Sequence, residues 1–358
     1  INSSPRTYPR ADGAEHDGDL CGDGASLVFN GPRIHEFLHE MNEAVLAPRG
    51  GHVITVGEMP GATLAEAPLY TDPARAEVDM VFQFEHVDLA NGPGGKFDPR
   101  PVDRVVLKRN LADWQAALAP ETDESGRITR ERGWNSTYWD NHDQPRAIDR
   151  FGDADRFRYE SATMLATAIH LMRGTPYVYM GEEIGMSDPG YTTIEDYVDI
   201  EARNAFAELV AAGHEADEAF RIVHSKARDN ARTPMQWDAS ASAGFTDGVP
   251  WLRPTNQDEV NVAHEEASGR ILPYYRRLIA LRKSVPVISG GAYEPYAIDD
   301  PDIMAYVRHD AEHRLLVVCS LRGPETGVDL PADLLGGGVP VPNPPLRSPR
   351  ARLYMPPY

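Results

Sequence analysis

The chain has 358 residues, with 35 Lys and Arg against 55 Asp and Glu, and a formal net charge of −20. This charge repels phosphate groups and no basic cluster interrupts it, which argues against nucleic-acid and anionic-membrane partners. No run of about 18 apolar residues occurs, so no membrane span is predicted. Cys21 and Cys319 lie too far apart for a disulfide framework and are expected to be ordinary buried thiols, which fits a reducing, cytoplasmic location.

The first half of the chain alternates between strand and helix patterns. Residues 1–32 are rich in Gly, Asp and Pro and are expected to form a long loop. Apolar residues at helical spacing then alternate with short β-rich runs, which predicts βαβ units and a parallel sheet. The expected elements, in order, are a helix at 33–46, strands at 52–57 and 80–86, a helix at 102–118, a strand at 135–140, a helix at 158–173 and a strand at 175–180.

The sequence pattern changes twice in the second half of the chain. A charged, mostly helical insertion is predicted at about 187–240, followed by a helix at 271–285 that ends before Pro286. From residue 287 onward, short apolar runs are separated by Asp, Pro and Gly clusters, which is typical of an all-β domain. The predicted domains are therefore residues 1–286 and residues 287–358.

Polar residues follow three of the predicted strands. They are Glu58, the run Asn141, His142 and Asp143, and the pair Glu182 and Glu183. A single carboxylate after a strand is more often a helix cap or a solvated turn. In parallel α/β folds, however, the carboxyl ends of the strands share one face, so the three groups are expected to converge on one pocket. Paired carboxylates are the groups that cleave glycosidic bonds.

Five segments carry a resemblance to a known family. They are ThrValGlyGluMetProGly at 55–61, ValPheGlnPheGluHis at 81–86, GlyTrpAsnSerThrTyrTrpAspAsnHisAspGlnProArg at 133–146, GlyThrProTyrValTyrMetGlyGluGluIleGlyMet at 174–186 and ArgAspAsnAlaArgThrProMetGlnTrpAsp at 228–238. They resemble successive segments of the α-amylase family, in its oligo-1,6-glucosidase and α-glucosidase branch.

The resemblance implies an α/β fold, the C-terminal half of a (β/α)8 TIM barrel followed by a small antiparallel β-sandwich domain. Ile1 and Asn2 match a dipeptide that lies just after the family's nucleophilic Asp. We therefore expect the nucleophile, the first four barrel strands and the inserted loop domain to precede this chain. The final strand of the β domain is also expected to be missing.

The resemblance assigns a role to each matching residue. Glu58 matches the general acid/base, which requires a raised pKa, expected from partial burial and a nearby carboxylate. Asp143 matches the carboxylate that stabilises the transition state, and His142 and Arg228 match residues that hold the same glucose. Arg232 is expected to brace the loop instead. The positions that match leaving-side contacts are Lys96, Glu201 and Phe84, of which Lys96 could equally be a solvated loop residue and Phe84 a core residue.

The predicted function is that of a retaining exo-α-glucosidase, which cleaves short α-1,6- or α-1,4-linked oligosaccharides by double displacement. A non-catalytic relative serving as a structural or transporter-associated subunit is a second hypothesis, although the presence of Glu58 and Asp143 argues against it. A transglycosylase or isomerase is a third, although the sequence at 87–95 lacks the Arg- and Asp-rich loop of sucrose isomerases. We predict no metal and no cofactor, apart from a possible calcium ion in the missing half.

Overall fold

The computed structural model describes residues 29–124 and 127–321, together with the backbone of two strands at 326–329 and 352–355. The predicted N-terminal loop falls almost wholly outside the described residues, as does Cys21. Cys319 is a buried free thiol, as predicted, and its burial raises its pKa to about 12. None of the helices in the described ranges is long and apolar enough to cross a bilayer.

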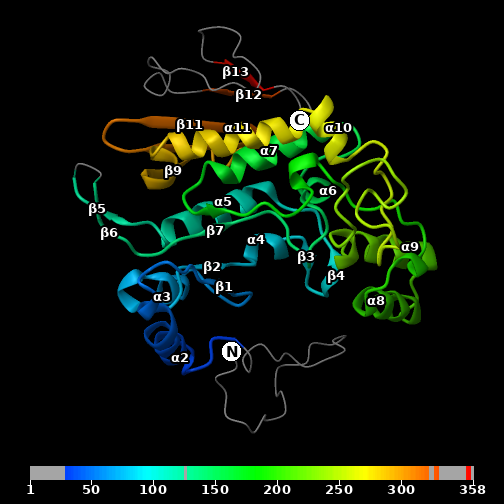
Figure 1. Ribbon diagram of the computed structural model, residues 1–358, viewed down its shortest axis with the longest axis horizontal. Helices are drawn as coiled ribbons and strands as arrows, with labels where there is room; N and C mark the ends of the chain where they lie inside the picture. Colours follow the sequence, from blue (N-terminus) through cyan, green and yellow to red (C-terminus); the bar gives the residue numbers. More distant parts are fainter. Residues whose placement is uncertain (1–28, 125–126, 322–325, 330–351, 356–358) are drawn as a thin grey trace.

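Four short parallel strands lie side by side at the centre of the molecule (Figure 1). They are β1 (Val56–Glu58), β2 (Met80–Phe82), β7 (Ser136–Thr137) and β8 (Thr175–Pro176). β1 pairs with β2 and β7 pairs with β8, while a parallel bridge between Val81 and Asn135 joins the two pairs. The predicted parallel pairing is confirmed, and the strands lie in the order in which they occur in the chain.

These strands are shorter than the sequence predicts. β2 ends at Phe82 because the chain turns into helix α4 (Glu85–Asp88). β8 ends at Pro176, although Tyr177 extends its ladder by one hydrogen bond, from its N–H to Thr137 O at 2.8 Å. Within the described residues, β1 and β8 each have a strand partner on one side only, so fewer of their residues are held in extended ladders.

The helices lie close to the predicted positions. The helix expected at 33–46 is α2 (Ile34–Met41), followed by a π-helical turn (Asn42–Leu46). The helix expected at 102–118 is α5 (Arg104–Ala117). Asp103 caps α5 by accepting hydrogen bonds from the N–H groups of Val105 and Val106. The remaining α-helices of the described residues are α3 (Ala67–Thr71), α6 (Ala147–Phe151), α7 (Arg158–His170), α8 (Ile200–Ala211), α9 (Ala216–His224), α10 (Val262–Ala267), α11 (Ile271–Ser284) and α12 (Val287–Gly290).

Two small antiparallel ladders lie in the loops between these elements. β3 (Asn91–Gly92) pairs with β4 (Gly95–Pro99), and β5 (Glu121–Thr122) pairs with β6 (Ile128–Arg130). β4 carries Lys96, and α8 and α9 lie beside it at one side of the molecule (Figure 1). The loop after β2 and the helices predicted as an insertion therefore approach each other.

The strands of the C-terminal part are antiparallel, as expected from the short apolar runs in its sequence. Strands β9 (Ala292–Tyr296), β10 (Ile303–His309) and β11 (Arg314–Ser320) form a sheet in the order β11-β10-β9, and β12 (Thr326–Asp329) pairs with β13 (Arg352–Met355). The three-stranded sheet shares one hydrophobic core with α7 and α11, to which Tyr306, Ile169 and Leu278 belong. The hydroxyl of Tyr306 also donates to Ala168 O at 2.8 Å, which ties β10 to α7.

A buried lysine joins helix α5 to the turn before β10. Lys108 is 2% exposed, and its ammonium donates to Ala297 O at 3.1 Å, to Ile303 O at 2.8 Å and to Asp300 O. Burial lowers the pKa of Lys108. Two backbone carbonyls of the turn and one at the start of β10 therefore accept hydrogen bonds from one side chain of α5.

We predict that Lys108→Met lowers the free energy of unfolding of the full-length protein by about 1–3 kcal/mol, because it leaves buried carbonyl oxygens without a donor. Urea unfolding followed by circular dichroism measures the loss. Lys283→Met, at an exposed position of α11, is the matched control and should change stability by less than about 0.5 kcal/mol. Equal effects of the two substitutions would contradict the bracing role of Lys108.

Candidate active site

Glu58 lies at the carboxyl end of β1, opposite Phe82 of β2. The ring of Tyr138 contacts the ring of Phe82 edge to face at 5.0 Å and lies 6.3 Å from that of Phe84. Burial, the charge of Asp88 and the charge of Glu58 raise the pKa of Tyr138. Glu58 and the half-buried Phe84 are thus near one tyrosine, but the partial burial predicted for Glu58 is not supplied by the described residues, among which it is exposed.

Asp143 lies on the loop between β7 and α6, called here the Asp143 loop (residues 140–147). The side chain of Asn141 accepts a hydrogen bond from Asp143 N at 2.8 Å, and Asp140 Oδ2 accepts one from Ala147 N at 2.7 Å. Asn and Asp side chains commonly hold turns in this way. The sequence Trp-Asp-Asn-His-Asp therefore builds a turn whose shape is fixed by its own polar residues.

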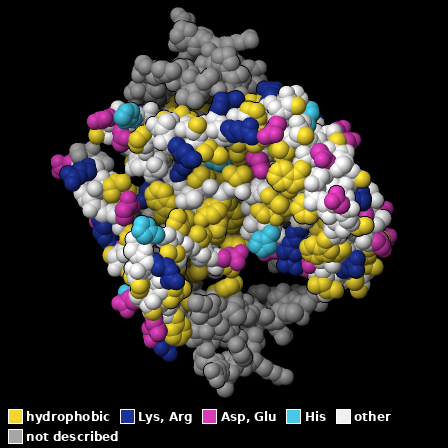
Figure 2. Space-filling model, viewed as in Figure 1, with side chains coloured by type: hydrophobic (Ala, Val, Ile, Leu, Met, Phe, Trp, Pro, Cys, Tyr) yellow, Lys and Arg dark blue, Asp and Glu magenta, His cyan; other side chains and the backbone are white. Residues whose placement is uncertain are grey.

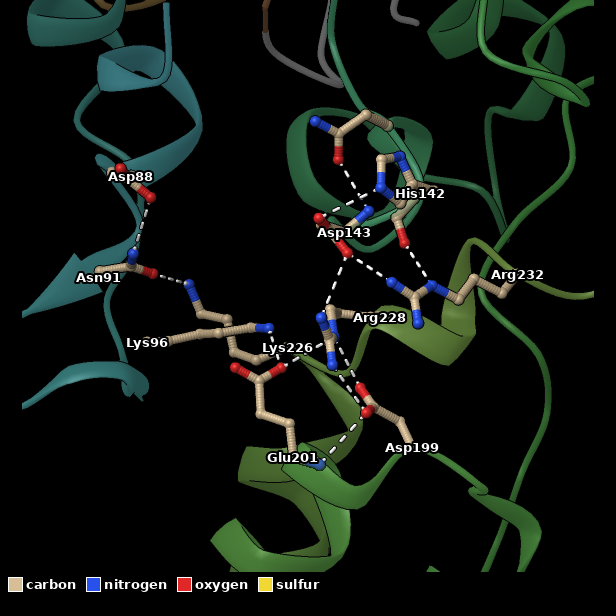
Figure 3. A network of polar contacts seen from close by, with 11 residues as sticks. Asp88, Asn91, Lys96, His142, Asp143, Asp199, Glu201, Lys226, Arg228 and Arg232 are labelled. Carbon is tan, nitrogen blue, oxygen red and sulfur yellow. Dashed lines mark hydrogen bonds and ion pairs between the residues drawn. The ribbon is translucent and has the colours of Figure 1, made fainter. Parts of the chain in front are cut away.

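Two arginines and a histidine surround the carboxylate of Asp143 (Figure 3). Its Oδ1 lies 2.5 Å from Arg232 Nη2 and 3.5 Å from Arg228 Nη1, and its Oδ2 lies 3.3 Å from His142 Nε2. Arg232 Nε also donates to His142 O at 2.7 Å. Arg232 thus braces the loop, as predicted, but it is also the nearer of the two arginines to Asp143, which the sequence did not reveal.

Arg228 is held from its other side by Asp199, a residue that the sequence reasoning missed. Arg228 Nε and Nη2 donate to the two carboxylate oxygens of Asp199, both at 2.8 Å. Asp199 is buried and caps α8 by accepting from Glu201 N at 3.2 Å. The hydrogen bond from Arg228 lowers the pKa of Asp199, and the same bond raises that of Arg228. Both groups therefore stay charged, in a bidentate geometry that fixes the guanidinium plane.

The network continues to Lys96 and Glu201. Glu201 Oε2 lies 3.2 Å from Arg228 Nε and 2.5 Å from Lys96 Nζ. Two of the three residues predicted on the leaving-group side, Lys96 and Glu201, are thus brought together with Arg228, and Glu201 forms ion pairs with both Lys96 and Arg228.

A second buried lysine lies beside this network (Figure 3). Lys226 Nζ donates to Ala90 O and to Asn91 Oδ1, both at 2.8 Å, and Asn91 Nδ2 donates to Asp88 Oδ1 at 3.1 Å. Burial lowers the pKa of Lys226 to about 8. Lys226 therefore ties the segment after α9 to the loop between α4 and β3.

Glu182 and Glu183, the polar residues that follow β8, do not belong to the network of Figure 3. Glu183 Oε2 accepts a hydrogen bond from Gly181 N at 2.7 Å, and Glu182 lines a buried cavity together with Asp140. Of the three strand ends that the sequence singles out, the one after β8 thus turns its first glutamate into the protein interior.

In Figure 2, acidic, histidine and basic side chains lie close together near the centre of the face in view, beside a broad apolar area. Among the described residues, no three His, Cys, Asp or Glu side chains are placed to hold a metal ion. The predicted absence of a metal and a cofactor stays a prediction for the whole protein.

Comparisons with known proteins identify the family of the chain. Residues 5–291 match the family described as "Alpha amylase, catalytic domain". The chain is 47% identical over 322 residues to an oligo-1,6-glucosidase of Parageobacillus thermoglucosidasius, covering 89% of this chain and 55% of that protein.

Solved structures are similar along almost all of the chain. The trehalose-6-phosphate hydrolase of Bacillus licheniformis matches with a TM-score of 0.83 and 38% identity, over 95% of this chain and 60% of that one. A trehalulose synthase, MutB, matches with a TM-score of 0.81 and 31% identity, over 94% and 59%. The chain spans about half the length of the curated relatives it matches. Its sequence, its strand order and its match over residues 5–291 show that the chain belongs to the α-amylase family of glycoside hydrolases.

Proposed function

We propose that this chain supplies the second half of the active site of a retaining exo-α-glucosidase that acts on short α-linked oligosaccharides. The observation that carries the proposal is the placement of Asp143, with Arg228, Arg232 and His142 around it, at the carboxyl end of β7. Glu58 lies at the same end of β1 in the same set of parallel strands. Enzymes with such strands bind substrates at this edge.

In the proposed reaction, an Asp that precedes this chain attacks the anomeric carbon and forms a covalent glycosyl-enzyme. Glu58 protonates the leaving oxygen and then, as a carboxylate, removes a proton from the water that hydrolyses the intermediate. Asp143 and His142 hydrogen-bond the hydroxyls of the glucose. These bonds shorten as the ring flattens toward the oxocarbenium-like transition state, so they lower the barrier.

The charge network supports cleavage at the chain end. Asp199 holds Arg228 with two hydrogen bonds, so Arg228 and Arg232 are fixed on one side of Asp143. We propose that they close the glucose site on that side, so that it admits a single terminal glucose. Lys96 and Glu201, with Phe84, would contact the sugar on the leaving side, where the choice between α-1,6 and α-1,4 bonds is made.

The outer strands β1 and β8 support the proposal that a preceding half-barrel completes the sheet. Exposed apolar side chains cluster next to β1 and β8, at Val53, Ile54, Val56, Val178 and Met180. Unpaired edges with apolar residues require a partner, and we propose that residues 1–286 are completed by a preceding half-barrel, with residues 287–358 forming a β-sandwich domain. The buried free thiol of Cys319 supports a cytoplasmic location.

The first prediction concerns Glu58. Glu58→Gln in the full-length protein should lower the turnover of an unactivated glucoside by about 10²- to 10⁴-fold, because proton transfer to the leaving oxygen is lost. Azide, which attacks the intermediate without a base, should restore part of the turnover of a nitrophenyl glucoside. Steady-state kinetics measure both effects. Near-normal turnover on the unactivated substrate would refute the assignment, and Glu208→Gln, at an exposed position of α8, is the control.

The second prediction concerns Asp199. Asp199→Asn removes the charge that holds Arg228, so Arg228 gains freedom to move onto Asp143. We expect kcat/KM for a short oligosaccharide to fall by about tenfold or more, a loss of about 1.4 kcal/mol. Glu195→Gln, at an exposed position before α8, should leave kcat/KM unchanged. Unchanged kinetics in Asp199→Asn, with the fold intact by circular dichroism, would show that Arg228 needs no support.

The third prediction concerns the chain in isolation. Residues 1–358 alone should release no glucose and should aggregate, because the apolar edges of the strands stay uncovered. Co-expression with the preceding half of the protein should restore soluble protein and glucose release, measured by size-exclusion chromatography and a coupled glucose assay. Glucoside hydrolysis by the isolated chain would contradict the placement of the nucleophile upstream.

Transfer of glucose to another sugar is the competing function, favoured by the similarity to a trehalulose synthase. The same intermediate serves both reactions, since only the acceptor differs. Chromatography of the products at high substrate concentration separates them, because hydrolysis gives free glucose as the main product and transfer or isomerisation gives new glucosides.

A further inference from the structure

Two carboxylates, each with a buried oxygen atom, meet at the start of the Asp143 loop, outside the network of Figure 3. Asp140 follows β7 and is 3% exposed, and Glu182 follows β8. Both line one cavity of about 20 Å³, whose other walls are mostly apolar and include Trp139, Leu165 and Tyr275. Asp140 Oδ1 and Glu182 Oε1 are buried, and neither accepts a hydrogen bond from any described group.

Two such oxygens are costly when both carboxylates are ionised. A buried charge needs a paired countercharge or hydrogen bonds. Within the described residues, no Arg, Lys or His nitrogen lies within 4 Å of either carboxylate as an ion pair. Arg146 donates from Nη1 to Met180 O and from Nη2 to Thr233 Oγ1, and its buried Nε makes no hydrogen bond. A single proton held between the two carboxylates removes one charge and satisfies both orphaned oxygens.

We propose that Asp140 and Glu182 share one proton, and that this proton joins the ends of β7 and β8 and so fixes the Asp143 loop. The other oxygen of Asp140 accepts the N–H of Ala147, which closes that loop at the start of α6. Asp140 is thus a positioning residue, and Glu182 is the group that holds it. The inference does not depend on the proposed glucosidase activity.

The surroundings favour the protonated form of Glu182. Its pKa is raised well above the ordinary value of 4.5, by burial, then by the charge of Asp140 and the hydrogen bond with it, and then by Glu183, against a smaller opposing effect of Arg146. The titratable and charged groups that act on the pair from the neighbouring elements are Arg146, Arg150, Tyr179, Glu183, Asp188 and Tyr275.

The sign of the pH dependence follows from the raised pKa of Glu182. The group binds its proton more tightly in the folded state than in the unfolded state. Its stabilising contribution is therefore complete below about pH 4.5, the unfolded value, and is lost as the pH rises toward the folded pKa. Protonation thus holds the Asp143 loop at low pH, and the hold weakens as the pH rises toward the folded pKa of Glu182.

Amide variants test the proposal, because an amide N–H replaces the proton at every pH. At each pH, the Tm of the full-length wild type is compared with that of Asp140→Asn and with that of Glu182→Gln. Between pH 5 and pH 9, we expect the wild-type Tm to fall by at least about 3 °C relative to each variant. Glu208→Gln removes a charge at an exposed position of α8, away from the pair, and should keep the wild-type dependence. A constant Tm difference across this range, or an equal effect of Glu208→Gln, would overturn the shared proton.

Infrared spectroscopy of the wild type at pH 7 needs no variant to fold. The stretch of a protonated carboxyl group should be present, and it should weaken in Asp140→Asn and in Glu182→Gln. A wild-type spectrum with no such band would show that both groups are ionised and that the proposal is wrong.

Discussion

The site depends on one constraint, the parallel pairing of β1, β2, β7 and β8. Parallel strands all end at the same edge, so residues that are far apart in the sequence, such as Glu58 and Asp143, are carried to one side of the sheet by the pairing alone. The strands themselves are only two or three residues long. Loops that begin at this edge carry most of the polar groups of the site, and their shapes are fixed by hydrogen bonds within them.

The charge balance of the site differs from that of the chain. The chain carries a net charge of −20. The network of Figure 3 contains three cations and three anions in direct contact, namely Lys96, Arg228, Arg232, Asp143, Asp199 and Glu201. Such a network offers oriented donors and acceptors without a strong field of either sign. This is suited to a neutral ligand with many hydroxyl groups, whereas a polyanion would meet a repulsive surface around a neutral site.

Much of this arrangement could be predicted from the sequence. The alternation of helical and β-rich patterns gave the parallel strands, the helices α5, α7 and α11, and the antiparallel C-terminal strands. The strand ends and the family resemblance singled out Asp143, His142 and Arg228, which the structure places in contact. Strand lengths were overestimated because apolar runs continue beyond the residues paired in the ladders, at buried positions such as Tyr138 after β7 and at exposed positions such as Val178 after β8.

Other features of the site have no signal in a single sequence. Asp199 is recognisable as a helix cap before α8, but a capping Asp becomes a partner of Arg228 only through the position of α8 beside the Asp143 loop. Glu182 and Glu183 are adjacent and chemically alike, yet one binds a backbone N–H of its own turn and the other is buried against Asp140. The backbone decides which of the two neighbouring carboxylates faces the interior. Gly181 has a left-handed conformation, with a φ of 98°, and it sets the direction of the chain where the chain leaves β8.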